Sequence, residues 1–132
     1  LYEEVIARDP SIDVAANNLA SLLTDHFESP ENLQRALILS SRFRDSEQAY
    51  FADTFGWVNY KMGNYEDARQ ALERATSSSD AIALFHYHLG RVYVALSMSE
   101  EARQSFERAQ RMANEENDEA LVAKITEQLS QL

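Results

Sequence analysis

The chain has 132 residues, a net charge of −10 and no cysteine. The negative charge argues against nucleic acid as a partner, and the missing cysteines exclude disulfide bonds and thiolate metal sites. No apolar run approaches the ~18 residues that a membrane span needs, so we expect no membrane insertion within this segment.

The composition favours helices along the whole chain. Ala, Leu, Glu, Gln and Arg are abundant, while only three Gly and two Pro interrupt the sequence. These residue types favour long helices joined by short connections. We therefore predict an all-α fold and a single domain that spans residues 1–132.

The N-terminal stretch 1–11 has the pattern of one isolated helix. Tyr2, Val5 and Pro10 indicate the second helix of an incomplete repeat, whose first helix would precede the chain. The sequence opens with Leu1 and not with an initiator methionine. We therefore expect a C-terminal fragment of a longer protein.

A repeating pattern dominates the centre of the chain. Residues 55–60 (FGWVNY) align with 89–94 (LGRVYV), and 67–70 (DARQ) align with 101–104 (EARQ), each at an offset of 34 residues. A constant period of this length is typical of stacked helix pairs, in which each unit buries its apolar faces against the next.

An earlier copy of the pattern is looser. It begins near Ala16 and continues at Ala36, with about four extra residues in its internal loop. Ser29 is a favourable N-cap ahead of Pro30, which suits the first turn of a helix. Gly63 predicts a helix end in the following copy.

The C-terminal segment 116–132 predicts a capping helix. From about Asn117 onward, Leu121, Ile125 and Leu129 recur at helical spacing, while charged residues occupy the other side. One face can pack on the preceding unit and the other can face water, as the end of a stack requires.

These signals together predict about eight helices. The predicted units are an incomplete repeat (1–11), a repeat with a longer internal loop (12–46), two further repeats (47–81 and 82–115) and the capping helix (116–132). Within each unit, small residues such as Ala20, Gly56 and Gly90 should let the paired helices approach closely. Large residues such as Leu19 and Phe55 should fill the remaining space.

Two motifs resemble a known family. Leu-Gly-x-x-Tyr at 89–93, Ala-x-x-x-Phe-x-x-Ala at 102–109 and the period of 34 are similar to the tetratricopeptide repeat. The sequence of residues 53–58 (DTFGWV) resembles that of bacterial members of the family. The resemblance implies a right-handed α-solenoid of antiparallel helix pairs, whose first helices line a concave groove for a peptide or partner protein.

Asp53 and Tyr87 replace residues of the family's chaperone-binding carboxylate clamp, so we do not expect that specialisation.

The implied groove would present three helical stripes. The candidate partner-binding residues are Asn17, Ser21 and Thr24 in the first stripe, Asp53, Trp57, Tyr60 and Lys61 in the second, and Tyr87, Arg91 and Val94 in the third. Aromatic residues and Arg are typical of interface hot spots. The indole of Trp57 could instead pack between helices, because side chains of this size are usually mostly buried. Both orientations stay open from the sequence.

No group of residues predicts a reaction centre. His86 and His88 are two positions apart on a helix and point in different directions, so they cannot bind one metal ion. We expect them to line the core or the groove. The sequence has no Gly-rich phosphate loop and no nucleophile elbow. We therefore expect no catalytic residue, no metal site, no cofactor and no enzyme activity.

The leading functional hypothesis is a scaffold or adaptor that binds a peptide or a partner protein. The alternative is structural self-association, because Tyr2, Val5 and Ile6 would expose an apolar edge that invites a homodimer or a longer stack. The compartment stays open, since proteins without cysteine occur both in the cytoplasm and in the bacterial periplasm or envelope.

Overall fold

The computed structural model describes residues 10–132, and this part of the chain contains helices and no strand. The elements are α2 (Pro10–Asp25), α3 (Pro30–Ser40), the 3₁₀ turn η1 (Ser41–Phe43), α4 (Ala49–Lys61), α5 (Tyr65–Ser77), α6 (Ala83–Ala95), α7 (Ser99–Glu115) and α8 (Glu119–Ser130). The all-α prediction is confirmed. The helix expected from Tyr2 and Val5 lies outside the described residues.

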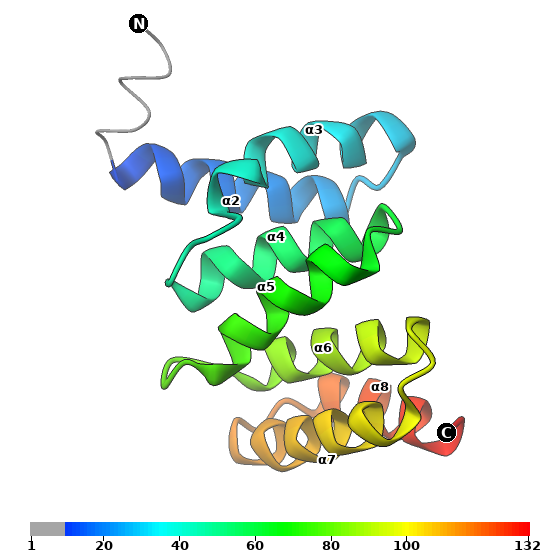
Figure 1. Cartoon of the computed structure of the whole chain (residues 1–132). Coiled ribbons are helices and arrows are strands. Elements are labelled where there is room, and N and C mark those ends of the chain that lie inside the picture. Colours follow the sequence, from blue (N-terminus) through cyan, green and yellow to red (C-terminus); the bar gives the residue numbers. More distant parts are fainter. Residues whose placement is uncertain (1–9) are drawn as a thin grey trace, which may run out of the picture.

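The helices form hairpins that follow one another along a single axis (Figure 1). Within the hairpins, α2 packs on α3, α4 on α5 and α6 on α7. Successive hairpins meet where α3 contacts α4 and α5 contacts α6, and α8 packs against α7. Among the first helices, α4 also contacts both α2 and α6. The predicted α-solenoid is therefore confirmed, and its first helices share one side.

Small residues allow the two helices of each hairpin to approach closely. A Cβ added to Gly56 would lie 2.6 Å from Cγ of Leu72, and one added to Gly90 would lie 2.5 Å from the Phe106 ring. Leu72 and Phe106 are fully buried, so neither can move out of the way easily. Leu19 was expected to fill space between helices, but it is 38% exposed, and that expectation is wrong.

Several helix caps and helix ends that the sequence predicts are present in the structure. The Ser29 side chain accepts a hydrogen bond from the backbone N–H of Asn32 and caps α3. Gly63 follows α4 with a φ of +85°, a left-handed conformation that glycine adopts without strain. At the last helix the cap is Asp118, whose carboxylate accepts from the N–H of Leu121. Asn117 lies one residue before it in the left-handed region.

The extra residues of the looser copy lie only partly in its loop. The connection 26–29 is one residue longer than 62–64, the connection between α4 and α5. The other three, 30–32, form an added first turn of α3, because Ser29 and Pro30 together start the helix early. We keep the division into repeats as a proposal. Its expected boundary between residues 11 and 12 falls inside α2.

The contact between Gly90 and Phe106 gives a stability prediction. Gly90→Ala should lower the free energy of unfolding by about 1–3 kcal/mol, because the new methyl group overpacks against a buried ring. Urea unfolding followed by circular dichroism measures the loss. Adding Phe106→Leu should make the alanine less costly than it is beside the phenylalanine ring. A Gly90→Ala chain as stable as the wild type would contradict the close contact.

Candidate partner-binding groove

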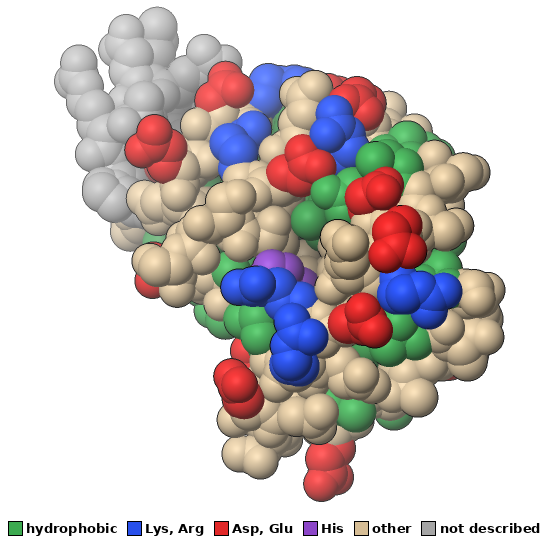
Figure 2. All heavy atoms as spheres, turned by 60° about the horizontal axis from the view of Figure 1, so that its bottom comes forward, with side chains coloured by type: hydrophobic (Ala, Val, Ile, Leu, Met, Phe, Trp, Pro, Cys, Tyr) green, Lys and Arg blue, Asp and Glu red, His purple; other side chains and the backbone are tan. Residues whose placement is uncertain are grey.

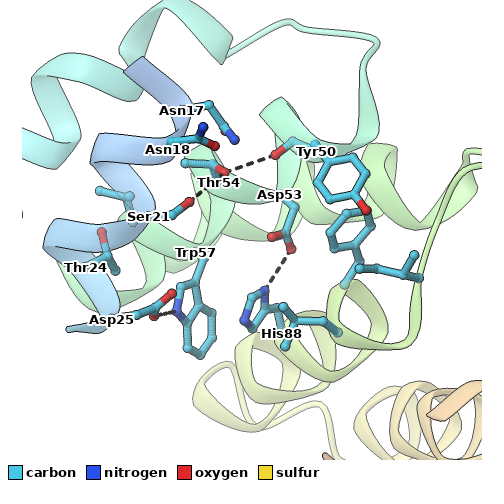
Figure 3. Close-up of a pocket in the computed structure, with 14 residues that line it drawn as sticks. Asn17, Asn18, Ser21, Thr24, Asp25, Tyr50, Asp53, Thr54, Trp57 and His88 are labelled. Atoms are coloured by element: carbon cyan, nitrogen blue, oxygen red, sulfur yellow. Dashed lines mark hydrogen bonds and ion pairs between the residues drawn. The ribbon is translucent and has the colours of Figure 1, made fainter. Parts of the chain in front are cut away.

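A pocket of about 280 Å³ opens between the first helices α2, α4 and α6. Figure 3 shows side chains from these helices around it. The sequence-predicted residues that line it are Asn17, Ser21 and Thr24 from α2 and Asp53 and Trp57 from α4. The first two stripes thus converge on one hollow, because the same side of each first helix faces it.

Trp57 forms one wall of this pocket and is also largely buried, with 8% of its surface exposed. Its ring stacks on His88 of α6 at a centroid distance of 3.9 Å and on Tyr60 at 4.7 Å. Its indole N–H donates to Asp25 at the end of α2, at 3.1 Å. Trp57 therefore both packs between helices and lines the groove, which combines the two orientations considered from the sequence.

A buried hydrogen bond joins α4 to α6 beneath the Trp57 ring. The Nδ1 atom of His88 lies 2.8 Å from Oδ1 of Asp53, and only 6% of each residue is exposed. With Asp53 ionised, His88 is the donor. Because both groups are shielded from water, losing one partner would leave the other unpaired at substantial cost. This contact sets the relative position of two walls of the pocket.

Asn17 stands out among the polar residues of the pocket. Its Oδ1 atom is buried and has no hydrogen-bond partner within residues 10–132. By contrast, the Thr24 hydroxyl donates to the Ala20 carbonyl of its own helix at 2.7 Å. The Ser21 hydroxyl lies 3.4 Å from that of Thr54. Asn17 is thus the acceptor in this wall that still lacks a donor.

A second group of predicted residues lies beside the pocket and does not line it. The guanidinium group of Arg91 donates to the hydroxyls of Tyr87, at 2.9 Å, and Tyr60, at 3.3 Å. The Lys61 ammonium lies 5.4 Å from the centroid of the Trp57 ring and pairs with a Glu28 carboxylate at 3.1 Å. An aromatic and basic cluster therefore lies next to the pocket on α4 and α6.

Val94 stands apart from both groups. It lies on α6 three residues beyond Arg91, and 41% of its surface is exposed. It does not line the pocket.

Several pocket residues were not predicted from the sequence. Tyr50, Thr54 and Leu84 line the pocket together with His88, which was expected only to line the core or the groove. Tyr50 and Leu84 are separated by the 34-residue period, as are Thr54 and His88. Extending the second and third stripes by one helical turn toward the N-terminus would have found Tyr50 and Leu84, whereas Thr54 and His88 lie within the ranges that these stripes already span. No pattern in the sequence indicates that Asp25 lines the pocket.

His86 lies on a different side of α6 from His88, because residues two apart on a helix are about 200° apart. It is 6% exposed and faces residues of α7. Burial, reinforced by the positive charge of Arg108, lowers the pKa of His86 to about 4. The imidazole is therefore neutral near pH 7. No group of three or more side chains suited to a metal ion occurs within residues 10–132.

Helical hairpins that stack along one axis and line a common pocket define a helical-repeat protein. Residues 54–117 match the family model of the tetratricopeptide repeat. A 74-residue stretch is 36% identical to a TPR repeat-containing protein of Pseudomonas aeruginosa. That stretch covers 53% of this chain and 12% of the relative's length, so the chain spans a small part of that protein. These two comparisons relate the chain to tetratricopeptide repeat proteins.

The similarity to this family has a general functional meaning. Tetratricopeptide repeats generally mediate protein–protein interactions, and the family is one of non-catalytic scaffolds. Within residues 10–132, no helix combines the length and the apolar character that crossing a membrane requires.

The low pKa of His86 predicts a pH dependence of stability. The unfolded chain binds a proton at this residue near pH 6.5, whereas the folded chain binds it only near pH 4. Stability therefore falls as the pH is lowered through this window. The contribution of His86 to this loss should reach at most about 3 kcal/mol.

The measurement is urea unfolding of the wild type and of His86→Gln at pH 7.5 and at pH 4.5. The variant should lose less stability between the two pH values, because glutamine does not titrate. Equal losses in the two chains would contradict the assigned pKa.

Proposed function

We propose that the chain is an adaptor that binds a peptide, or a short segment of a partner protein, in the pocket between α2, α4 and α6. The observation that carries the proposal is the Oδ1 atom of Asn17, a buried acceptor without a donor at the pocket wall. An unpaired buried acceptor typically costs about 1–3 kcal/mol. A backbone or side-chain N–H of a bound segment would recover part of that cost.

The charges around the pocket favour a partner that donates hydrogen bonds. The carboxylates of Asp25 and Asp53 line the pocket, and no Lys or Arg of residues 10–132 does. Asp53 already accepts from His88, but Asp25 is exposed and its carboxylate can accept more than one hydrogen bond. Together with Asn17, these groups suit amide or cationic donors.

The other wall of the pocket favours apolar contact. Tyr50 is 56% exposed and Leu84 is 38% exposed, and both line the pocket. Partly exposed large side chains beside polar groups are typical of a ligand site. An apolar side chain of the partner would cover them, while its neighbouring N–H groups reach Asn17.

The neighbouring cluster gives the groove its length. Arg91 is held by two tyrosine hydroxyls and by no carboxylate of residues 10–132. Its guanidinium group therefore keeps its full charge for an acidic or carbonyl group of the partner. A segment running from Asn17 past Trp57 to Arg91 would meet acceptors first and a donor last, which would give it one preferred direction.

We propose binding without catalysis or a cofactor. Asp53 and His88 form an acid–base pair, but both are buried and their hydrogen bond joins α4 to α6. Ser21 and Thr54 are the hydroxyls nearest to each other in the pocket wall, and neither is paired with a histidine. The groups that line the pocket therefore lack the nucleophile–base contact that covalent catalysis needs.

The groove hypothesis can be tested with peptides selected from a random library against the folded chain. Trp57 is the only tryptophan of the chain, so its fluorescence reports whether the groove is occupied. Asn17→Ala should weaken a selected peptide about fivefold, the equivalent of one lost hydrogen bond. It should not lower stability through a lost hydrogen bond, because the Oδ1 atom has no partner to lose.

The matched control is Asn114→Ala, an exposed asparagine on α7. It should bind the selected peptide as the wild type does. If peptides bind without changing Trp57 fluorescence and are indifferent to Asn17→Ala, the binding site lies elsewhere on the chain.

A second candidate function is self-association through the N-terminal end of the stack. The residues that first suggested it, Tyr2, Val5 and Ile6, lie outside the described residues. Within α2 and α3, however, Val14 is 51% exposed and Ile38 is 64% exposed. Apolar side chains of this exposure gain free energy when a second surface covers them.

Self-association predicts a molar mass that rises with concentration. Static light scattering between micromolar and millimolar chain concentration should show the transition to a dimer, and Ile38→Ser should move it to higher concentration. The exposed Leu22 of α2 offers a second variant, Leu22→Ser. A constant monomer mass over the whole range would exclude this function for the chain.

A further inference from the structure

A second pocket lies between α6 and α7, on the outer side of the stack. Its volume is about 330 Å³, and none of its lining residues belongs to the groove. Figure 2 shows basic side chains gathered beside a histidine on this face. The residues that matter for its chemistry are His86 from α6 and Glu101, Ser105, Arg108 and Arg111 from α7.

Two buried polar side chains of this pocket have no partner. His86 is 6% exposed and Ser105 is 9% exposed, yet neither makes a hydrogen bond within residues 10–132. Within residues 10–132, the unpaired side-chain polar atoms that are completely shielded from solvent belong to Asn17 and Arg74, and not to His86 or Ser105. The polar atoms of His86 and Ser105 are therefore open to the pocket that they line.

The pocket also concentrates positive charge on a chain of opposite net charge. Arg108 and Arg111 are three residues apart on one side of α7, and neither is engaged in an ion pair within residues 10–132. Glu101 is the one carboxylate among the lining residues, so an excess of one positive charge remains. On a chain with a net charge of −10, two guanidinium groups left together without carboxylate partners call for an explanation.

We propose that this pocket binds an oxyanion, the carboxylate or phosphate group of a ligand, held by Arg108 and Arg111 with hydrogen bonds from His86 and Ser105. Guanidinium groups present paired N–H donors that match two oxygens of such a group. The neutral imidazole and the hydroxyl supply further donors. A cationic ligand is disfavoured, because it would meet two guanidinium groups.

The remaining polar residues of the pocket fit the same assignment. The hydroxyl of Tyr93 is already committed, since it donates to Glu73 at 2.6 Å. Gln104 lines the rim and is exposed. The pKa of His86 is lowered by burial and by Arg108, so an anion that neutralises the neighbouring charge should raise it. Occupancy of the pocket can therefore be read directly at His86.

The test is a titration of the folded chain at pH 7 with sodium phosphate or with sodium acetate, against sodium chloride at equal ionic strength. NMR of the histidine ring protons should show a saturable shift of the His86 signal and an upward shift of its pKa. Calorimetry with the same salts gives the affinity without relying on that signal. Arg108→Ala and Arg111→Ala should each weaken binding about tenfold.

The matched control is Arg103→Ala, which removes a charge from α7 without touching the pocket. It should retain the affinity of the wild type. Saturation by phosphate alone would assign a phosphate group to the ligand, and saturation by acetate alone would assign a carboxylate. The absence of saturation by either salt, or an equal loss in Arg103→Ala, would overturn the proposal. Peptide binding in the groove is measured at other residues and stands or falls independently.

Discussion

The close approach of the two helices within each hairpin determines the geometry of the stack. Gly56 and Gly90 leave room for Leu72 and Phe106 to lie directly against the backbone of the opposing helix. Interiors packed at this density tolerate little displacement, so a few residues of the repeat fix the spacing of the two helices in these hairpins. The sides of α4 and α6 that face the pocket are therefore held in a defined position.

The groove is a product of that regular spacing. Successive first helices carry side chains 34 residues apart, and pairs such as Thr54 with His88 therefore reach the same pocket. The bond between Asp53 and His88 and the stacking of Trp57 on His88 connect neighbouring hairpins. Asp53, Trp57 and His88 thus line the pocket and also hold neighbouring hairpins together, so substitutions there should affect the stack as well as the pocket.

The sequence predicted the fold well, because a constant period is a property of the chain alone. It predicted less of the site, since partners in space depend on the crossing of helices. The exposure of Leu19, the bond from Trp57 to Asp25 and the unpaired Asn17 follow from how α2 lies against α4. The pocket around His86 was missed for the same reason, because its residues come from two helices whose facing sides only the structure shows.

The two sides of α8 differ in character. Leu121 and Ile125 are buried against the preceding hairpin, while Glu119, Lys124 and Glu127 cover the outward side with charge. A side of this kind favours contact with water, because packing it against an apolar surface would remove its charges from solvent.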